Sequence, residues 1–191
     1  MVGMKAAMRR VDVYFLWLLV IFVGIQFGAG WYEKLAVVSL WADLPPDQVL
    51  DGMNESGMHR AGRAFWPFVS PVVAVAAVAN LVFAWRSTAP NRSWWLAGAA
   101  VMCGYAAISY GYFVPQMLTF QSDGGSWSPE RIDSFVTWWT RLNYGRMVIG
   151  GIGWLCLLRA LSLSTAYRDP GHADSEHRHA APLGIRDGQQ T

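Results

Sequence analysis

The chain has few charged residues. Lysine, arginine, aspartate and glutamate make up 15% of its 191 residues, whereas 53% are hydrophobic. Soluble domains average about 25% charged residues, so this composition favours a membrane protein over a soluble globular one. The net charge of +2 is too small to indicate a nucleic-acid-binding surface, and we expect no nucleic-acid partner.

Cysteines and cofactor-binding motifs are also scarce. Cys103 and Cys156 lie in apolar segments, and the chain contains no C-x-x-C redox motif. Two separate buried thiols fit this pattern better than a pair meeting between helices, although the sequence leaves both open. The apolar segments hold no metal-ligand set, no haem-like histidine pair and no glycine-rich nucleotide loop. We therefore expect neither a metal nor another cofactor.

The most prominent features present are four apolar stretches, at about residues 13–41, 65–85, 93–120 and 138–163. About 20 apolar residues in a helix cross the hydrocarbon core of a bilayer, which is roughly 30 Å thick. Many of the tryptophans lie near the ends of these stretches, as in the aromatic belts of membrane proteins. The sequence therefore predicts an all-α fold, an integral membrane four-helix antiparallel bundle over residues 13–163.

Basic residues indicate how this bundle is oriented. They are concentrated in the N-terminal segment 1–12, in the turn 86–92 and after the fourth span, whereas seven acidic residues fall in the two long connections. The positive-inside rule then places both termini in the cytoplasm of a multi-pass protein of the cytoplasmic membrane. The tail 164–191 is polar and lacks apolar periodicity, which predicts disorder. Its three histidines are interpreted as part of this tail rather than as a metal site.

Two polar residues within the fourth span stand out. Asn143 and Arg146 are three residues apart, so they share one face of a helix. A charge at bilayer depth costs roughly 2.5–3.5 kcal/mol on insertion scales and usually points into a bundle or a wet cavity. By helical rise, other polar residues fall in the same outer layer of the bundle: Glu33, Tyr110, Tyr112 and Gln116. His59, in the connection between the first and second spans, is placed to cover this layer. Asn80, in the second span, is expected to form a helix–helix hydrogen bond.

Two interpretations of this polar layer remain open, and they are not exclusive. In the first, Glu33 and Arg146 form a buried structural ion pair that holds the helices in register. In the second, the layer is a pocket in which Arg146 stabilises an anion or oxygen atom and Glu33 accepts a proton. A transporter is disfavoured, because the four spans show no detectable internal repeat.

A resemblance to a known family supports the pocket. Tyr112-Phe113-Val114-Pro115 at the end of the third span precedes Trp139-x-x-Leu142-Asn143-x-x-Arg146 at the start of the fourth, and Trp31-Tyr32-Glu33 lies in the first. This combination resembles the four-helix membrane family, largely of unknown function, that includes the anthrone oxygenase-like proteins. The match covers roughly residues 13–163.

The resemblance implies a cofactor-independent oxygenase of polycyclic aromatics, in which O₂ oxidises an anthrone to a quinone. With the polar layer, it suggests Glu33, Asn143 and Arg146 as catalytic residues. The ligand-binding candidates are Trp31, His59, Tyr110, Tyr112, Gln116 and Trp139. Expected partners are membrane lipid and a small hydrophobic aromatic or quinone-like molecule. The alternative is a non-enzymatic membrane protein, either a partner subunit or a lipid-binding module, with a structural Glu–Arg ion pair.

Overall fold

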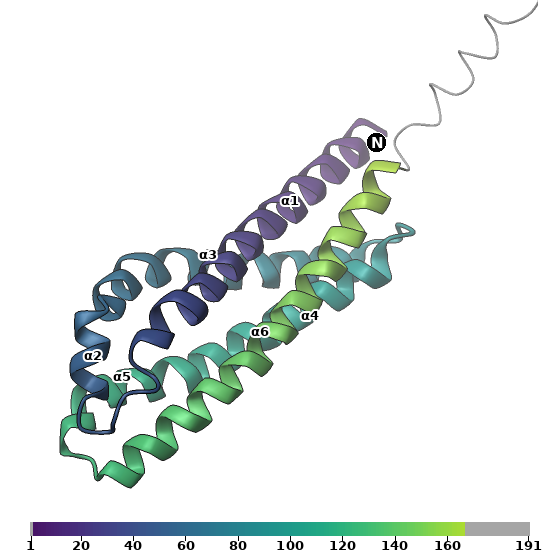
Figure 1. Ribbon diagram of the computed structural model, residues 1–191. Helices are drawn as coiled ribbons and strands as arrows, with labels where there is room; N and C mark the ends of the chain where they lie inside the picture. Colours follow the sequence, from purple (N-terminus) through teal and green to yellow (C-terminus); the bar gives the residue numbers. More distant parts are fainter. Residues whose placement is uncertain (1, 167–191) are drawn as a thin grey trace, which may run out of the picture.

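A computed structural model of the protein describes residues 2–166, with side chains for residues 12–164. Every regular element in this range is helical (Figure 1). Four helical stretches are long and apolar enough to cross a membrane: Asp12–Leu40, Met58–Arg86, Arg92–Ser126 and Pro129–Ser164. The all-α prediction is confirmed. The prediction of four spans is confirmed as far as the length and composition of the helices go. The predicted disordered tail, from residue 167 on and including its histidines, lies outside the described residues.

The first span ends in a change of helix type. Helix α1 (Val2–Tyr32) runs into a π-helical turn, η1 (Glu33–Val37), and then into a 3₁₀ turn, η2 (Val38–Leu40). π turns are rare and are frequently found at functional sites. The short helix α2 (Val49–Glu55) follows in the connection and buries two of its apolar residues.

The second span is longer than predicted. Helix α3 (Met58–Arg86) begins at Met58 rather than near residue 65. Gly57, with a φ of 73°, separates it from α2, because glycine adopts this left-handed conformation without steric cost. His59 therefore lies in the first turn of α3 and not in a loop.

The third span contains a second π turn. It comprises α4 (Arg92–Ile108), η3 (Ser109–Phe113), α5 (Val114–Asp123) and the 3₁₀ turn η4 (Gly124–Ser126). Pro115 lies in the first turn of α5, where its missing amide hydrogen is tolerated best.

The fourth span is one continuous helix, α6 (Pro129–Ala166). Residues 129–137, predicted to belong to a connection, are therefore part of it, as are residues 164–166 of the predicted tail. The Ser128 hydroxyl oxygen accepts a hydrogen bond from the Arg131 amide at 3.4 Å and caps the helix start.

Each long helix packs against two others. Helices α1 and α4 both contact α3, and both also contact α6 (Figure 1). The start of α1, the end of α6 and the α3–α4 turn lie at one end of the molecule, which we call the terminal end. Helix α2 and η4 lie at the opposite end, which we call the connection end (Figure 1).

Toward the terminal end, the helices are joined by buried hydrogen bonds and by a close glycine contact. Asn80 of α3 is fully buried. Its side-chain nitrogen donates to the Phe15 carbonyl of α1 at 2.9 Å, and its oxygen accepts from the Trp95 indole of α4, also at 2.9 Å. The predicted helix–helix role of Asn80 is confirmed. Gly98 brings α4 against α6, since a Cβ there would lie 2.7 Å from the Leu157 Cγ atom.

The connection end has its own apolar cluster. Trp41 and Phe120 are fully buried there, and Trp139 of α6 is 6% exposed and packs with them. Trp41 and Trp139 have their ring centroids 6.2 Å apart. A second apolar cluster, which includes Leu19, Val73 and Leu157, fills the bundle toward the terminal end. Both clusters border one cavity, which therefore lies between two packed layers.

Candidate functional site

A cavity of about 290 Å³ lies among α1, α3, α6 and the η3–α5 half of the third span. Its walls combine aromatic and apolar side chains with a small number of polar groups, as is usual in small-molecule sites. The lining residues include Gln26, Glu33, His59, Arg63, Trp66, Pro67, Ser70, Tyr105, Ser109, Tyr110, Phe113, Val114, Leu118, Trp139 and Arg146.

Arg146 of α6 supplies the positive charge of the cavity. Its guanidinium carbon lies 4.4 Å from the centre of the Phe113 ring and 5.5 Å from that of Tyr105. One terminal nitrogen donates to the Ser109 hydroxyl at 3.4 Å, while the buried Nε has no hydrogen-bond partner. The π turn η3 contributes both Ser109 and Phe113. The cation is thus held by aromatic faces and one weak hydrogen bond, and donor capacity remains unused.

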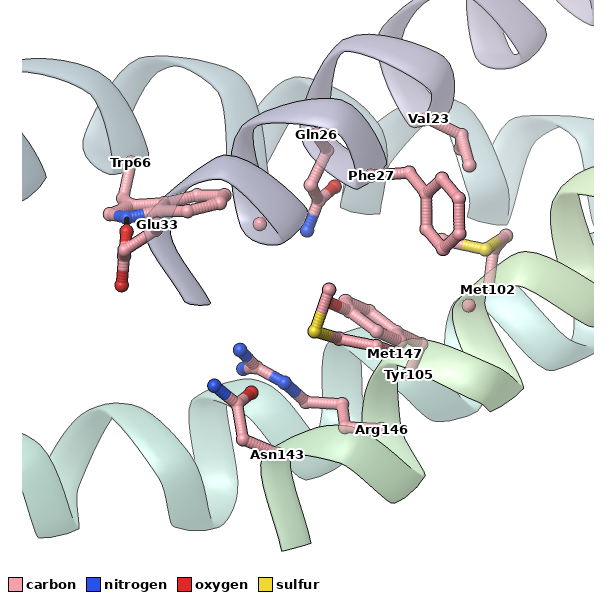
Figure 2. A pocket seen from close by; sticks show the side chains of 12 residues that line it. Val23, Gln26, Phe27, Glu33, Trp66, Met102, Tyr105, Asn143, Arg146 and Met147 are labelled. Atoms are coloured by element: carbon pink, nitrogen blue, oxygen red, sulfur yellow. Dashed lines mark hydrogen bonds between the residues drawn. The ribbon is translucent and has the colours of Figure 1, made fainter. Parts of the chain in front are cut away.

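Glu33 supplies the negative charge from the first π turn. Its carboxylate accepts a hydrogen bond from the Trp66 indole of α3 at 2.8 Å. Within the described residues, Glu33 and Arg146 are not joined by a direct ion pair, although their charges attract each other across the cavity. Figure 2 shows the Glu33 carboxylate beside Trp66 and the Arg146 guanidinium on the opposite wall. The direct structural ion pair considered from the sequence is therefore not formed.

A second, smaller cavity of about 20 Å³ adjoins the first and shares Gln26, Glu33, Trp66, Tyr105 and Arg146 with it. Gln26 of α1 and Asn143 of α6 are 8% and 5% exposed. Their side-chain oxygens are buried without a hydrogen-bond partner, like the Nε of Arg146. In Figure 2, Gln26, Asn143 and Arg146 point toward the same space. Buried polar atoms usually find partners, so three unpaired ones at one place indicate a binding region.

The structure brings together most of the predicted site residues, and all of the predicted catalytic ones. Glu33, His59, Tyr110, Trp139 and Arg146 line the larger cavity, and Asn143 lines the smaller one.

Three predicted ligand-binding residues line neither cavity. Tyr112 and Gln116 are exposed on the outside of η3 and α5. The Trp31 ring packs instead against Phe27 and Tyr144, with centroids 6.2 and 6.5 Å away. Their depth in the spans was predicted from helical rise, which says nothing about the direction in which each side chain points.

The cavity also contains residues that the sequence did not single out. Gln26 lies in the middle of the apolar first span, and Trp66 lies near the start of the second. Gln26 had a detectable signal, because a glutamine in an uncharged span is expected to face the bundle interior. Trp66 had none, since its hydrogen bond to Glu33 joins residues 33 positions apart.

Metal-binding clusters are absent from the part of the chain that the structure describes: no group of three His, Cys, Asp or Glu residues there could hold a metal ion. Cys103 and Cys156 are both free thiols, in line with the preferred interpretation of the sequence.

The arrangement can hold a ligand that carries an oxygen atom. Arg146 can donate to a carbonyl or phenolate oxygen, while Glu33 on the opposite wall can accept a hydrogen bond or a proton. Aromatic faces of Tyr105, Phe113 and Trp139 complete the walls. Comparison with known proteins adds no homologue: no family model, no curated protein and no solved structure matches the chain.

Proposed function

We propose that the protein is a multi-pass protein of the cytoplasmic membrane, with its four long helices forming an antiparallel bundle. The positive-inside rule supports cytoplasmic termini, because the turn 86–92 and the segments flanking the bundle are basic. The connection end then faces outward, and the cavity lies in the outer half of the bundle.

In this proposal the cavity binds a hydrophobic aromatic or quinone-like molecule. One observation carries the proposal: a cavity of about 290 Å³ with aromatic walls holds a cation, Arg146, and an anion, Glu33, that are not paired with each other. Its volume is close to the lower end of the roughly 300–1,000 Å³ common for ligand pockets. A membrane protein keeps such costly charges inside the bundle mainly where they serve a site.

The chemistry that best fits this pair of charges is that of an anthrone oxygenase. A ring CH₂ group would lose a proton to Glu33, and Arg146 would stabilise the resulting oxyanion. The electron-rich ring would then react directly with O₂. One oxygen atom becomes the new carbonyl and the other leaves as water, so the substrate supplies all the electrons. Asn143 would orient the oxygen-bearing edge of the ligand beside Arg146.

A thermal-shift screen of the detergent-purified protein tests the proposal. Anthrones, anthraquinones and other apolar aromatics are compared on the unmodified protein and on two variants, Arg146→Ala and Arg141→Ala. Arg141 is the matched control, because it is an exposed arginine of α6 that lines neither cavity. The proposal predicts compounds that stabilise the unmodified protein and Arg141→Ala, but not Arg146→Ala. O₂ consumption is then measured with those compounds.

Two outcomes of this screen would count against the proposal. Equal stabilisation of all three proteins would place the ligand away from Arg146. Stabilisation by phospholipids alone, with no response to any aromatic, would favour the lipid-binding module instead.

A further inference from the structure

The residues that line the larger cavity fall into two groups that differ in exposure. Those from α1 and α6 form a back wall: Gln26 and Trp139 are buried, and Glu33 and Arg146 are half-buried. The exposed lining residues all belong to α3 and to the η3–α5 segment. The cavity is therefore closed on the α1–α6 side and open where α3 faces η3–α5.

Each edge of this opening is a row at helical spacing. On α3 the row is Arg63, Pro67 and Ser70, and on the facing segment it is Tyr110, Val114, Leu118 and Gln121. Residues three or four apart lie on one face of a helix, so each row follows a single helix edge. Figure 1 shows α3 and α5 well separated at the connection end, whereas α3 and α4 come together at the terminal end.

The surroundings of the opening are apolar. Phe68 is 72% exposed and Val75 71% exposed on α3, while Leu118 is 55% exposed on α5. The deeper part of both rows lies in charge-free sequence, between residues 64 and 85 on α3 and between 93 and 122 on the third span. In a membrane-spanning helix, such exposed apolar surface is in contact with lipid tails.

Tyr110 and Ser70 lie at the deep end of the opening, one on each edge. The Tyr110 phenol, 45% exposed, and the half-buried Ser70 hydroxyl are the polar groups of the two rows at this depth.

From these observations we propose that the opening between α3 and η3–α5 is a lateral portal to the lipid bilayer, with Tyr110 and Ser70 on its two edges. The molecule that uses it is uncharged, apolar and dissolved in the membrane. The portal rests on the membrane insertion given in the proposed function, and the identity of that molecule as the cavity's ligand rests on the proposed aromatic-binding site.

A photolabelling experiment tests the portal without knowledge of the ligand. The protein is reconstituted in phospholipid vesicles with an iodophenyl diazirine, a small uncharged aromatic that partitions into the bilayer. After irradiation, mass spectrometry maps the adducts. The portal predicts adducts on Trp139, a buried residue of the back wall, as well as on the lipid-exposed Val75.

A cross-link between the two edges then closes the portal. In a background with both native cysteines changed to alanine, Ser70→Cys and Tyr110→Cys are joined by a short, reducible thiol cross-linker. We expect at least a fivefold loss of the Trp139 adducts, unchanged Val75 adducts and recovery after reduction. The matched control joins Asn91→Cys to Ser164→Cys, a hydrogen-bonded pair (2.6 Å) at the terminal end, and leaves labelling of Trp139 unchanged.

The outcomes separate the portal from the proposed function. Trp139 labelling that persists with the two edges cross-linked, or that is absent while Val75 is labelled, overturns the portal. If the cross-link controls labelling, the experiment is repeated with anthraquinone in the bilayer. Competition at Trp139 supports the proposed function, and lack of competition counts against it while the portal stands. Recovery after reduction shows that the cross-linked protein was folded.

Discussion

The hydrogen-bonded link at Asn80 gives the most direct prediction about what holds the helices together. Its side chain connects α3 to α1 through the Phe15 carbonyl and to α4 through the Trp95 indole, both at 2.9 Å. Interhelical side-chain hydrogen bonds in membrane proteins contribute about 0.6 kcal/mol on average and about 1.7 at most. Asn80→Ala removes two of them, so we expect the free energy of unfolding to fall by about 1–3 kcal/mol.

A double-mutant cycle isolates the part of this loss that comes from the Trp95 contact. Trp95→Phe removes the indole donor but also some ring packing, and the cycle cancels the packing term. The four proteins are unfolded reversibly in mixed micelles by increasing amounts of sodium dodecyl sulfate. We expect the double variant to lose less free energy of unfolding than the two single variants lose together, and the difference should be about 0.6–1.7 kcal/mol. Strict additivity would refute the idea that this hydrogen bond stabilises the protein.

Two further predictions concern packing and the site. Gly98→Ala should destabilise the α4–α6 contact by about 1–3 kcal/mol, because the new Cβ would meet the Leu157 side chain at 2.7 Å; mixed-micelle unfolding measures this loss. Trp66→Phe should lower the free energy of unfolding by about 1.5–3 kcal/mol in the same assay, because the Glu33 carboxylate loses its 2.8 Å hydrogen-bond donor. Hydrogen bonds to charged groups contribute free energies in this range.

Matched controls exist for both variants. Gly28→Ala, also in a long helix, adds a methyl group with nothing within 4 Å and should leave stability nearly unchanged. Trp85→Phe changes an indole that is 71% exposed and should also have little effect. A loss in either control as large as in its test variant would contradict the packing or the hydrogen-bond explanation, respectively.

The number and approximate position of the spans and the grouping of the polar layer could be predicted from the sequence, and the physical reason is simple. Charge-free runs of about 20 residues mark what can cross a bilayer, and a fixed rise per residue converts sequence position into depth. Glu33, Asn143 and Arg146 were placed in one layer on this basis. All three line the two adjoining cavities.

The direction of each side chain could not be predicted in the same way. The two π turns, η1 and η3, change the helical phase at Glu33 and over Ser109–Phe113. Phe113 is buried over the Arg146 guanidinium, whereas its neighbour Tyr112 is exposed. A lysine near the end of a span usually reaches outward along its stem. Lys34 is instead buried, with its Nζ atom 4.5 Å from the centre of the Tyr144 ring.

Helix boundaries at the connection end were also set by local signals that competed with hydropathy. The fourth helix begins at Pro129, well before the apolar run, as Ser128 at the cap and Pro129 at the first helical position predict from the sequence. Gly57 similarly allows α3 to begin at Met58. Hydropathy alone marks the membrane-embedded part of a helix and not its full length.

The central claim, that Arg146 anchors a ligand in the cavity, is tested most directly by a dissociation constant. A compound that stabilises the unmodified protein is titrated against that protein, Arg146→Ala and Arg141→Ala. A hydrogen bond to a charged group contributes about 1.5–3 kcal/mol, so Arg146→Ala should weaken binding by about 10- to 150-fold. Arg141→Ala should bind as the unmodified protein does. Equal affinity for all three proteins would contradict the account.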